Sequence, residues 1–347
     1  MSIYINGVLF DSNIGKHLYY QAVETANFDD NVLGALTAWH NNTGYGIGDP
    51  GPGFLNVTTS GTTGIPNRIS HSRDTVEQVV ESNIKILNLS RSSRMVNVFS
   101  PKGIAFTVLS LYIAEKLGCE LFIESFTGLN YINRLNELQP THTHILPNVW
   151  KTLNRHPRWA TLDLKNCESV ITGSDFTPNG MLNEIRQHGA NHVYNTYGST
   201  EVPPIVLMSK EENTYSINDV PAGCELKLQD DQIVCRWSTQ ENWWASGDCV
   251  EGDLNQFVIK GRKKSMFKQD HVRVYPEQLE KLAVLLGANL ALCQQIDNQC
   301  VLHYTGIISN TAELKNELNY IPRLILRQVD KIELDNNLKK IIRTQTF

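Results

Sequence analysis

The sequence lacks the features of a disulfide-stabilised, zinc-binding or membrane-spanning protein. Its seven cysteines are an odd number and none is spaced as Cys-x-x-Cys, so the spacing supports neither a disulfide framework nor a zinc knuckle. We expect buried free thiols in a reducing compartment. The most apolar late stretch, residues 282–293, is shorter than the roughly 20 residues that a helix needs to cross a bilayer.

The sequence also has no excess of positive charge. Lys plus Arg number 31 against 36 for Asp plus Glu, a formal net charge of −5, so we expect no nucleic-acid partner and no attraction to an anionic membrane. Residues 1–7 have neither a basic segment nor a long apolar one, which argues against a signal peptide. We therefore expect a cytoplasmic protein. There is no internal repeat.

The pattern of apolar residues predicts an α/β fold. A length of 347 residues suggests two domains at about 150 residues each. Up to residue 201, predicted strands alternate with predicted helices, which is typical of a largely parallel sheet; the strands are 54–57, 120–123, 169–172 and 192–195, and the helices are 74–89, 106–117 and 180–188. Short strands then predict a small antiparallel or barrel-like section, at 225–228, 232–236 and 256–259. A mixed α and β segment follows, with a helix at 276–286 and a strand at 301–304.

The sharpest local motif is the run Thr58-Thr-Ser-Gly-Thr-Thr-Gly-Ile-Pro66. It follows a predicted strand and precedes a predicted helix, and it offers hydroxyl and backbone N–H donors without bulky side chains. Such donors suit a polyphosphate. The Gly-Lys-Ser/Thr of the P-loop is absent. Taken alone, the composition fits a flexible polar turn equally well.

Together with further segments, this run resembles the signatures of the adenylate-forming superfamily, which includes acyl-CoA synthetases, adenylation domains of nonribosomal peptide synthesis and luciferases. The other matching segments follow in the order of that family: Thr172-Gly-Ser-Asp175, Asn195-Thr-Tyr-Gly-Ser-Thr-Glu201, Ala245-Ser-Gly-Asp248, residues 261–280 and Lys339-Lys-Ile-Ile-Arg343. The resemblance covers most of the chain. It implies a large N-terminal domain (1–263) and a small mobile C-terminal domain (264–347), with a hinge near Lys264.

The resemblance also implies roles for individual residues. Those expected to bind ATP are Thr58, Thr59, Ser60, Gly61, Thr62, Thr63, Gly64, Arg68, Gly173, Ser174, Asn195, Tyr197, Gly198, Asp248 and Arg262. Tyr197 would stack on adenine, Asp248 would accept hydrogen bonds from the ribose hydroxyls, and Glu201, after Thr200, would bind Mg²⁺. Lys340 would be the catalytic lysine, and Glu201 and Thr200 would be the other catalytic residues. Without the resemblance, each fits an ordinary structural role: a core tyrosine, a turn, a solvated glutamate or a solvated terminal lysine.

The activity implied is ATP-dependent activation of a small carboxylic acid. The products of the first step would be an acyl-AMP and pyrophosphate, and the acyl group would pass to a thiol of CoA or of a phosphopantetheine-bearing carrier protein. The alternative is a catalytically eroded adenylate-binding or regulatory module. That alternative is supported by Asn67 in place of the usual lysine, by Asp270 in place of a glycine, and by the short segment before Thr58.

Further expectations concern the substrate and assembly. Ile104, Phe106 and Ile205 suggest an apolar or aryl acid, in a pocket formed by residues 100–106, 172–176 and 202–206. The reduced N-terminal part suggests that a homodimer could cover an exposed sheet. His142 and His144 could form a metal pair, but with no third ligand at a recognisable spacing a structural role is favoured.

Overall fold

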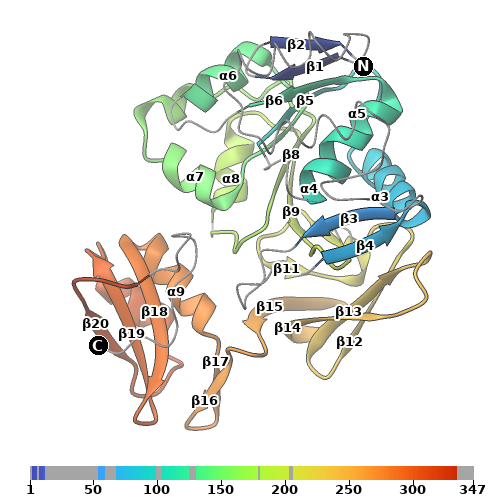
Figure 1. Ribbon diagram of the computed structural model, residues 1–347. Helices are drawn as coiled ribbons and strands as arrows, with labels where there is room; N and C mark the ends of the chain where they lie inside the picture. The colour runs from blue at the N-terminus through green and yellow to red at the C-terminus, as the bar shows by residue number, and fades with distance from the viewer. Residues whose placement is uncertain are drawn as a thin grey trace. The chain divides into compact units, whose positions relative to one another are not determined.

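Figure 1 shows the computed structural model of the chain. It describes residues 2–5, 8–11, 54–58, 68–98, 104–124, 130–178, 180–202 and 206–333. The chain divides into two compact units: unit 1 comprises residues 1–227, 234–245 and 254–256, and unit 2 comprises 228–233, 246–253 and 257–347. Each unit is described by itself. The expected domain boundary at Lys264 stays a prediction.

Unit 1 is built around an eight-stranded sheet with the strand order β10-β9-β8-β7-β5-β6-β1-β2. Neighbouring strands from β9 to β1 are parallel, and only the edge strands β10 and β2 run antiparallel to their neighbours. The α/β fold with a mostly parallel sheet is therefore confirmed. The bounds of the strands are β1 Ser2–Ile5, β2 Val8–Asp11, β5 Arg94–Asn97, β6 Glu120–Ile123, β7 His142–His144, β8 Ser169–Gly173, β9 His192–Tyr197 and β10 Leu207–Ser209.

Helices connect these strands, as the apolar periodicity predicts. Their bounds are α3 Arg73–Ile86, α4 Ile104–Phe106, α5 Tyr112–Leu117, α6 Asn130–Leu138, α7 Pro147–Leu153 and α8 Met181–Gln187, with 3-10 turns at Pro157–Thr161 and Ile217–Asp219. The single helix expected over 106–117 is wrong in detail, because a π-helical segment, Thr107–Leu111, separates α4 from α5. Gly118 ends α5 at φ 69°, the left-handed conformation that glycine adopts without steric cost.

One face of the sheet is covered by the apolar sides of α6, α7 and α8. The core there contains Tyr131, Leu135, Val149, Leu153, Val170, Leu182, Ile185 and Val193. Burying such side chains contributes about 1.5–3 kcal/mol each. This core packs α6, α7 and α8 against the sheet strands that include β8 and β9.

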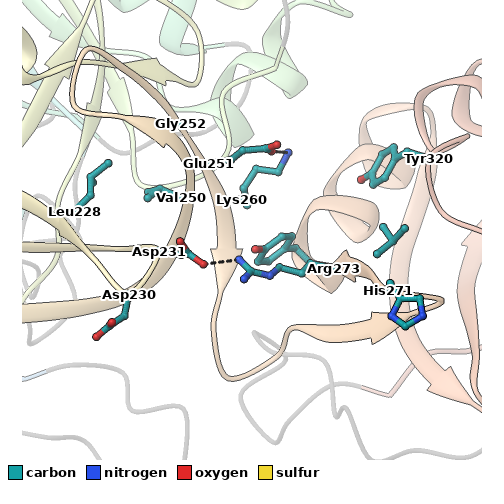
Figure 2. A pocket seen from close by; sticks show the side chains of 12 residues that line it. Leu228, Asp230, Asp231, Val250, Glu251, Gly252, Lys260, His271, Arg273 and Tyr320 are labelled. Carbon is teal, nitrogen blue, oxygen red and sulfur yellow. Dashed lines mark hydrogen bonds and ion pairs between the residues drawn. The ribbon is translucent and has the colours of Figure 1, made fainter.

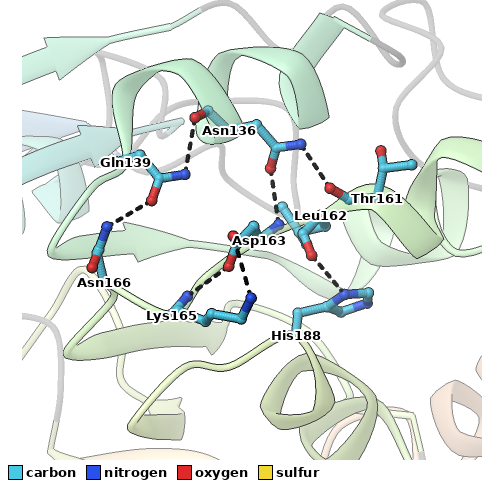
Figure 3. Close-up of polar contacts among 8 residues, drawn as sticks. All are labelled: Asn136, Gln139, Thr161, Leu162, Asp163, Lys165, Asn166 and His188. Carbon is cyan, nitrogen blue, oxygen red and sulfur yellow. Dashed lines mark hydrogen bonds and ion pairs between the residues drawn. The ribbon is translucent and has the colours of Figure 1, made fainter.

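Polar contacts tie α6 and α8 to the loop that enters β8 (Figure 3). Asn136 in α6 donates from Nδ2 to the carbonyl of Thr161 (2.7 Å), and its Oδ1 accepts from the N–H of Asp163 (2.9 Å). Nδ1 of His188, just after α8, donates to the carbonyl of Leu162 (3.1 Å). The loop before β8 is thus held by side chains from two helices.

A five-stranded sheet, with order β11-β15-β14-β13-β12, follows in the sequence. Its strands are β11 Thr214–Tyr215, β12 Cys224–Gln229, β13 Gln232–Trp237, β14 Trp244–Asp253 and β15 Gln256–Arg262. The three short strands expected here are confirmed and extended. Residues of these strands belong to both units.

The last part of unit 2 is mixed α and β, as expected. Its elements are β16 Phe267–Gln269, β17 Val272–Val274, α9 Pro276–Leu285, β18 Ala288–Ile296, β19 Gln299–Gly306, α10 Thr311–Glu317 and β20 Ile325–Gln328. Strands β18, β19 and β20 form a sheet in that order. Its core includes Leu279, Ala283, Leu302 and Leu314, which are all buried. Pro276 is the first residue of α9, where a missing N–H costs nothing.

Tight two-residue turns close the hairpins of unit 2 without glycine. Both turn residues have positive φ in each of them: Asp230 and Asp231, Asp270 and His271, Asp297 and Asn298. Such turns match the right-handed twist of the strands and admit Asp and Asn in the left-handed region. Asp270 also forms an ion pair with Arg323 (2.5 Å). Asp270 therefore has a structural role where the resemblance leads one to expect glycine.

The two histidines of β7 are core residues. Nε2 of His142 donates to the carbonyl of Leu87 (2.8 Å), and Nδ1 of His144 donates to the carbonyl of Val96 (3.3 Å). Both side chains are buried. Among the residues that the structure describes, no cluster of three or more His, Cys, Asp or Glu could hold a metal ion. These hydrogen bonds favour a structural role for His142 and His144 over a metal pair.

No described helix is both long and apolar enough to cross a membrane.

Burial of His144 predicts a loss of stability in acid. Burial lowers the pKa of its imidazole to about 4, below the value of about 6.5 for an exposed histidine. Below pH 6.5 the unfolded chain therefore binds a proton that the folded chain does not, and stability falls as the pH drops from 6.5 to 4, by about 3 kcal/mol at most for this group. Urea unfolding at pH 7, 6 and 5 measures this effect.

The variant His144→Asn keeps a donor for Val96 but cannot titrate, so its unfolding free energy should depend less on pH than that of the wild type. His271→Asn replaces an exposed histidine and serves as the control that keeps the wild-type dependence. Identical pH profiles for wild type and His144→Asn would contradict the prediction.

Candidate functional site

The residues predicted from the sequence fall into two groups, one in each unit. Unit 1 holds Gly173, Ser174, Asn195, Tyr197, Gly198, Thr200 and Glu201, whereas unit 2 holds Asp248 and Arg262. Several predicted positions lie outside the described residues: Thr59, Ser60, Gly61, Thr62, Thr63, Gly64, Asn67, Ile205 and Lys340. Their roles stay predictions.

The unit 1 group lies at the carboxyl ends of two adjacent parallel strands. Gly173 is the last residue of β8 and pairs in register with Thr196 of β9, and Tyr197 ends β9. In open α/β sheets, ligands bind outside the carboxyl ends of the strands. The structure therefore brings the segments around 173 and 197, which are separate in the sequence, to one edge of the sheet.

Gly173 is required by the close approach of β9. A β-carbon at this position would contact Oγ1 of Thr196 and lie 2.6 Å from the carbonyl oxygen of Thr196. Ser174, the next residue, turns the chain away with φ 67°, a conformation that is uncommon for a residue other than glycine. The backbone at the end of β8 is thus sterically specified.

Hydrogen bonds order the same edge. Asn195, almost fully buried, accepts at Oδ1 from the hydroxyl of Thr177 (2.8 Å). The hydroxyl of Thr196 donates to the carbonyl of Thr172 in the neighbouring strand (2.8 Å). Asn213 fixes Thr177 in turn, since it accepts from the Thr177 N–H (3.2 Å) and donates to its carbonyl (2.6 Å). These bonds hold the residues before Tyr197 in one arrangement.

The segment around the Ser/Thr/Gly run is a β-hairpin. Strand β3 (Phe54–Thr58) pairs antiparallel with β4 (Arg68–Ser72), with Thr58 opposite Arg68. The strand expected before the run and the helix expected after it are both present, and the unexpected β4 lies between the run and α3. The two strands that flank the run are thus paired with each other.

Histidine 71 on β4 contacts the second motif and was missed by the sequence analysis. Its side chain is 3% exposed, and Nε2 lies 2.7 Å from the carbonyl oxygen of Thr200. Burial lowers the pKa of His71, while the hydrogen bond to Thr200 and the charge of Glu201 oppose that change. The hairpin and the segment that carries Glu201 are therefore directly linked. No motif in the sequence marks this contact.

In unit 2 the two predicted residues form an ion pair. Nε of Arg262 in β15 lies 3.0 Å from Oδ1 of Asp248 in β14, and Nη1 donates to the carbonyl of Ser246 (3.0 Å). The Asp248 side chain is 10% exposed. The backbone N–H of Asp248 donates to Oγ of Ser246 (3.0 Å). Gly247 between them has φ 72°. A buried carboxylate is thus neutralised by a guanidinium that also holds the preceding turn.

A cavity of about 670 Å³ lies within unit 2, and neither Asp248 nor Arg262 lines it (Figure 2). Its walls carry two ion pairs, Asp231 with Arg273 (2.8 Å) and Glu251 with Lys260 (2.9 Å). Tyr320 also lines it. Because its charged groups are largely paired with one another, the cavity offers no single ligand charge to complement. The sequence analysis gave no indication of it.

Comparison with known proteins gives a family match. The profile of the family described as AMP-binding enzyme matches residues 55–236. The indoleacetate–CoA ligase of Aromatoleum aromaticum is 23% identical over 257 residues, which cover 65% of this chain and 50% of the ligase. The chain spans about half the length of the related proteins that it matches in sequence.

Solved structures share the fold. The anthranilate–CoA ligase AuaEII in complex with anthranoyl-AMP superposes with a TM-score of 0.68 at 16% identity, over 81% of this chain and 64% of that one. The o-succinylbenzoate–CoA synthetase MenE of Bacillus subtilis with ATP and a magnesium ion gives 0.66 at 17% identity, over 84% of this chain and 69% of that one. At these identities the likeness concerns the fold.

Proposed function

The chain belongs to the AMP-binding enzyme family, and on that basis we propose that it joins a small carboxylic acid to the AMP part of ATP. The observation that carries the proposal is the gathering of the 173–174 and 195–201 segments at the carboxyl ends of β8 and β9. Segments that were matched separately in the sequence thus come together in the fold. The ion pair of Asp248 and Arg262 supports it, because it joins two further matched residues.

In the proposed reaction the substrate supplies its own nucleophile. A carboxylate oxygen attacks the α-phosphorus of ATP, the bond to the bridging oxygen breaks, and pyrophosphate leaves with the electron pair. The task of the protein is to position the two reactants and stabilise developing charge. Tyr197 would face adenine, and Asp248 would face the ribose. Glu201 would bind Mg²⁺, because its exposed carboxylate is a suitable oxygen ligand. The ion would neutralise phosphate charge.

We further propose that the acyl group then passes to a thiol. The thiol sulfur would attack the acyl carbonyl, AMP would leave, and the thiol proton would pass to water. CoA and the phosphopantetheine arm of a carrier protein are the two acceptors of suitable chemistry. In this proposal residues 264–347 move about Lys264 between the two steps, and Lys340 acts in the first.

An apolar or aryl acid is the proposed substrate class. Ile104 and Phe106, named from the sequence as pocket residues, are both buried in unit 1. The relatives that support this choice act on aromatic acids by name, indoleacetate and anthranilate. An amino acid would be expected to need a carboxylate for its α-amine.

Pyrophosphate exchange into ATP, measured over a panel of aryl, alkyl and amino acids, tests the proposed function. We expect exchange that depends on an added acid, with aryl or alkyl acids preferred over amino acids. Binding of ATP without exchange for any acid would instead favour the alternative, an adenylate-binding regulatory module.

Asp248→Ala should weaken the binding of ATP while the fold is kept. The substitution removes a charge-assisted acceptor for the ribose hydroxyls, a loss of about 2–3 kcal/mol or 30- to 150-fold in Kd. Calorimetric titration with ATP measures it. Asp231→Ala, which removes another ion-paired aspartate of unit 2, should leave ATP affinity unchanged. Equal affinities for wild type and Asp248→Ala would contradict the ribose assignment.

Lys340→Ala should slow exchange by about 10²-fold or more, because a lysine at the α-phosphate neutralises charge as the new bond forms. Its neighbour provides the matched control, since Lys339 occupies the position where the family has glycine and Lys339→Ala should be tolerated. If the two variants exchange pyrophosphate at the same rate, the register of this segment is wrong.

A further inference from the structure

A single peptide group, the one between Thr200 and Glu201, is held at both of its polar ends. Its carbonyl oxygen lies 2.7 Å from Nε2 of His71. Its N–H donates to Oγ of Ser199 (3.1 Å), which also accepts from the N–H of Val202 (3.3 Å). A peptide group is planar, so two bonds on opposite edges fix its orientation. That orientation sets where the Glu201 side chain leaves the backbone.

One polar end of this peptide group is held by a residue close in the sequence, and the other end by a distant one. Ser199 is local and makes a turn with the residues that follow it, a common use of a serine hydroxyl. His71 is distant in sequence, 129 residues from Thr200. Because a carbonyl oxygen can only accept, Nε2–H of His71 is the donor in this hydrogen bond. Only the histidine can relate Glu201 to another part of unit 1.

Hydrogen bonds of the residues that follow His71 hold the strand that carries it. Ser72, the next residue, caps α3 by accepting from the N–H of Thr75 (3.3 Å). The hydroxyl of Thr75 is bonded to that of Thr239 (2.8 Å), and Nε2 of Gln78 donates to Oγ of Ser238 (2.6 Å). In the pairing of β3 with β4, Thr58 lies opposite Arg68 at the end of the same hairpin. His71 therefore connects Glu201 to an element that cannot shift freely.

Glu201 has no described side-chain hydrogen bond that would hold its carboxylate. The residue is exposed, and the only hydrogen bond of the residue within the described part of the chain is the backbone one to Ser199. Its charge nevertheless acts on the imidazole of His71. The carboxylate thus depends on its backbone, rather than on side-chain partners, for its position.

We propose that His71 is a positioning residue that orients Glu201 for the divalent cation bound with ATP, and that Ser199 assists it from the other end of the peptide group. The inference rests on the proposed function, because it assigns Glu201 to Mg²⁺. Removing the imidazole frees the peptide group to rotate, which weakens the contribution of Mg²⁺ to nucleotide binding and spares contacts made to the nucleotide alone. His71 does not contact the reacting atoms.

The test is calorimetric titration of the full chain with ATP, once with excess Mg²⁺ and once with EDTA. His71→Leu should reduce the Mg²⁺-dependent gain in affinity by about tenfold and leave the affinity in EDTA unchanged. His71→Gln, whose Nε2 can donate to the same carbonyl, should restore most of the gain. A merely structural role for His71 would not separate the two titrations.

His142→Leu is the matched control. His142 is likewise a buried histidine of unit 1 that donates from Nε2 to a backbone carbonyl, that of Leu87 (2.8 Å), and it lies on β7, outside the predicted site. It should lower the melting temperature and keep the Mg²⁺-dependent gain. Equal gains in wild type and His71→Leu, or equal losses in His71→Leu and His142→Leu, would overturn the proposal.

Ser199→Ala keeps the proposal testable if His71→Leu does not fold. It removes the bond at the other end of the same peptide group and should reduce the Mg²⁺-dependent gain as well, whereas an unchanged gain would contradict the proposal. The proposed function fails separately: a wild type that binds no ATP with or without Mg²⁺ would overturn it, and no variant would be needed to see this.

Discussion

The close approach of β8 and β9 at Gly173 is the constraint on which the candidate site of unit 1 depends. Any side chain at that position would collide with Thr196, so glycine allows β8 to remain paired with β9 up to its last residue. Pairing to the end brings the turn at Ser174 beside the segment that begins at Tyr197. Both segments would lie further apart if the strands separated earlier. A steric condition at one backbone position thus determines which chemical groups are neighbours.

Much of the fold could be predicted from the sequence because its signals are local. Helix α8 and strands β6 and β8 follow from apolar periodicity, and Gly118 ends α5 as its conformational freedom predicts. Strand β4 could not be predicted in the same way, because its sequence, Arg-Ile-Ser-His-Ser, has no apolar run and the strand forms by pairing with β3. The π-helical segment has no local signal of its own, since an added residue in a helix is accommodated by packing.

The residues of the candidate site also divide into those that local sequence signals could predict and those that they could not. Residues such as Asp248 and Glu201 could be named because their chemistry and order along the chain resemble a family signature. His71 could not, because a histidine that donates to a backbone carbonyl 129 residues away leaves no pattern in either segment. Asp270 is the opposite case, because the sequence showed a departure from the family pattern and the structure explains it. The residue type departs from the expected glycine, yet aspartate adopts the positive φ that the turn needs and gains a partner in Arg323.

Each group of candidate residues is ordered by contacts inside its own unit. Arg262 neutralises Asp248 and holds the Ser246 carbonyl, so the carboxylate is oriented before any ligand arrives, and little conformational entropy remains to be lost on binding. The peptide group before Glu201 is fixed by His71 and Ser199 in the same sense. Preorganisation of this kind lies within each unit and does not depend on the arrangement of one unit against the other.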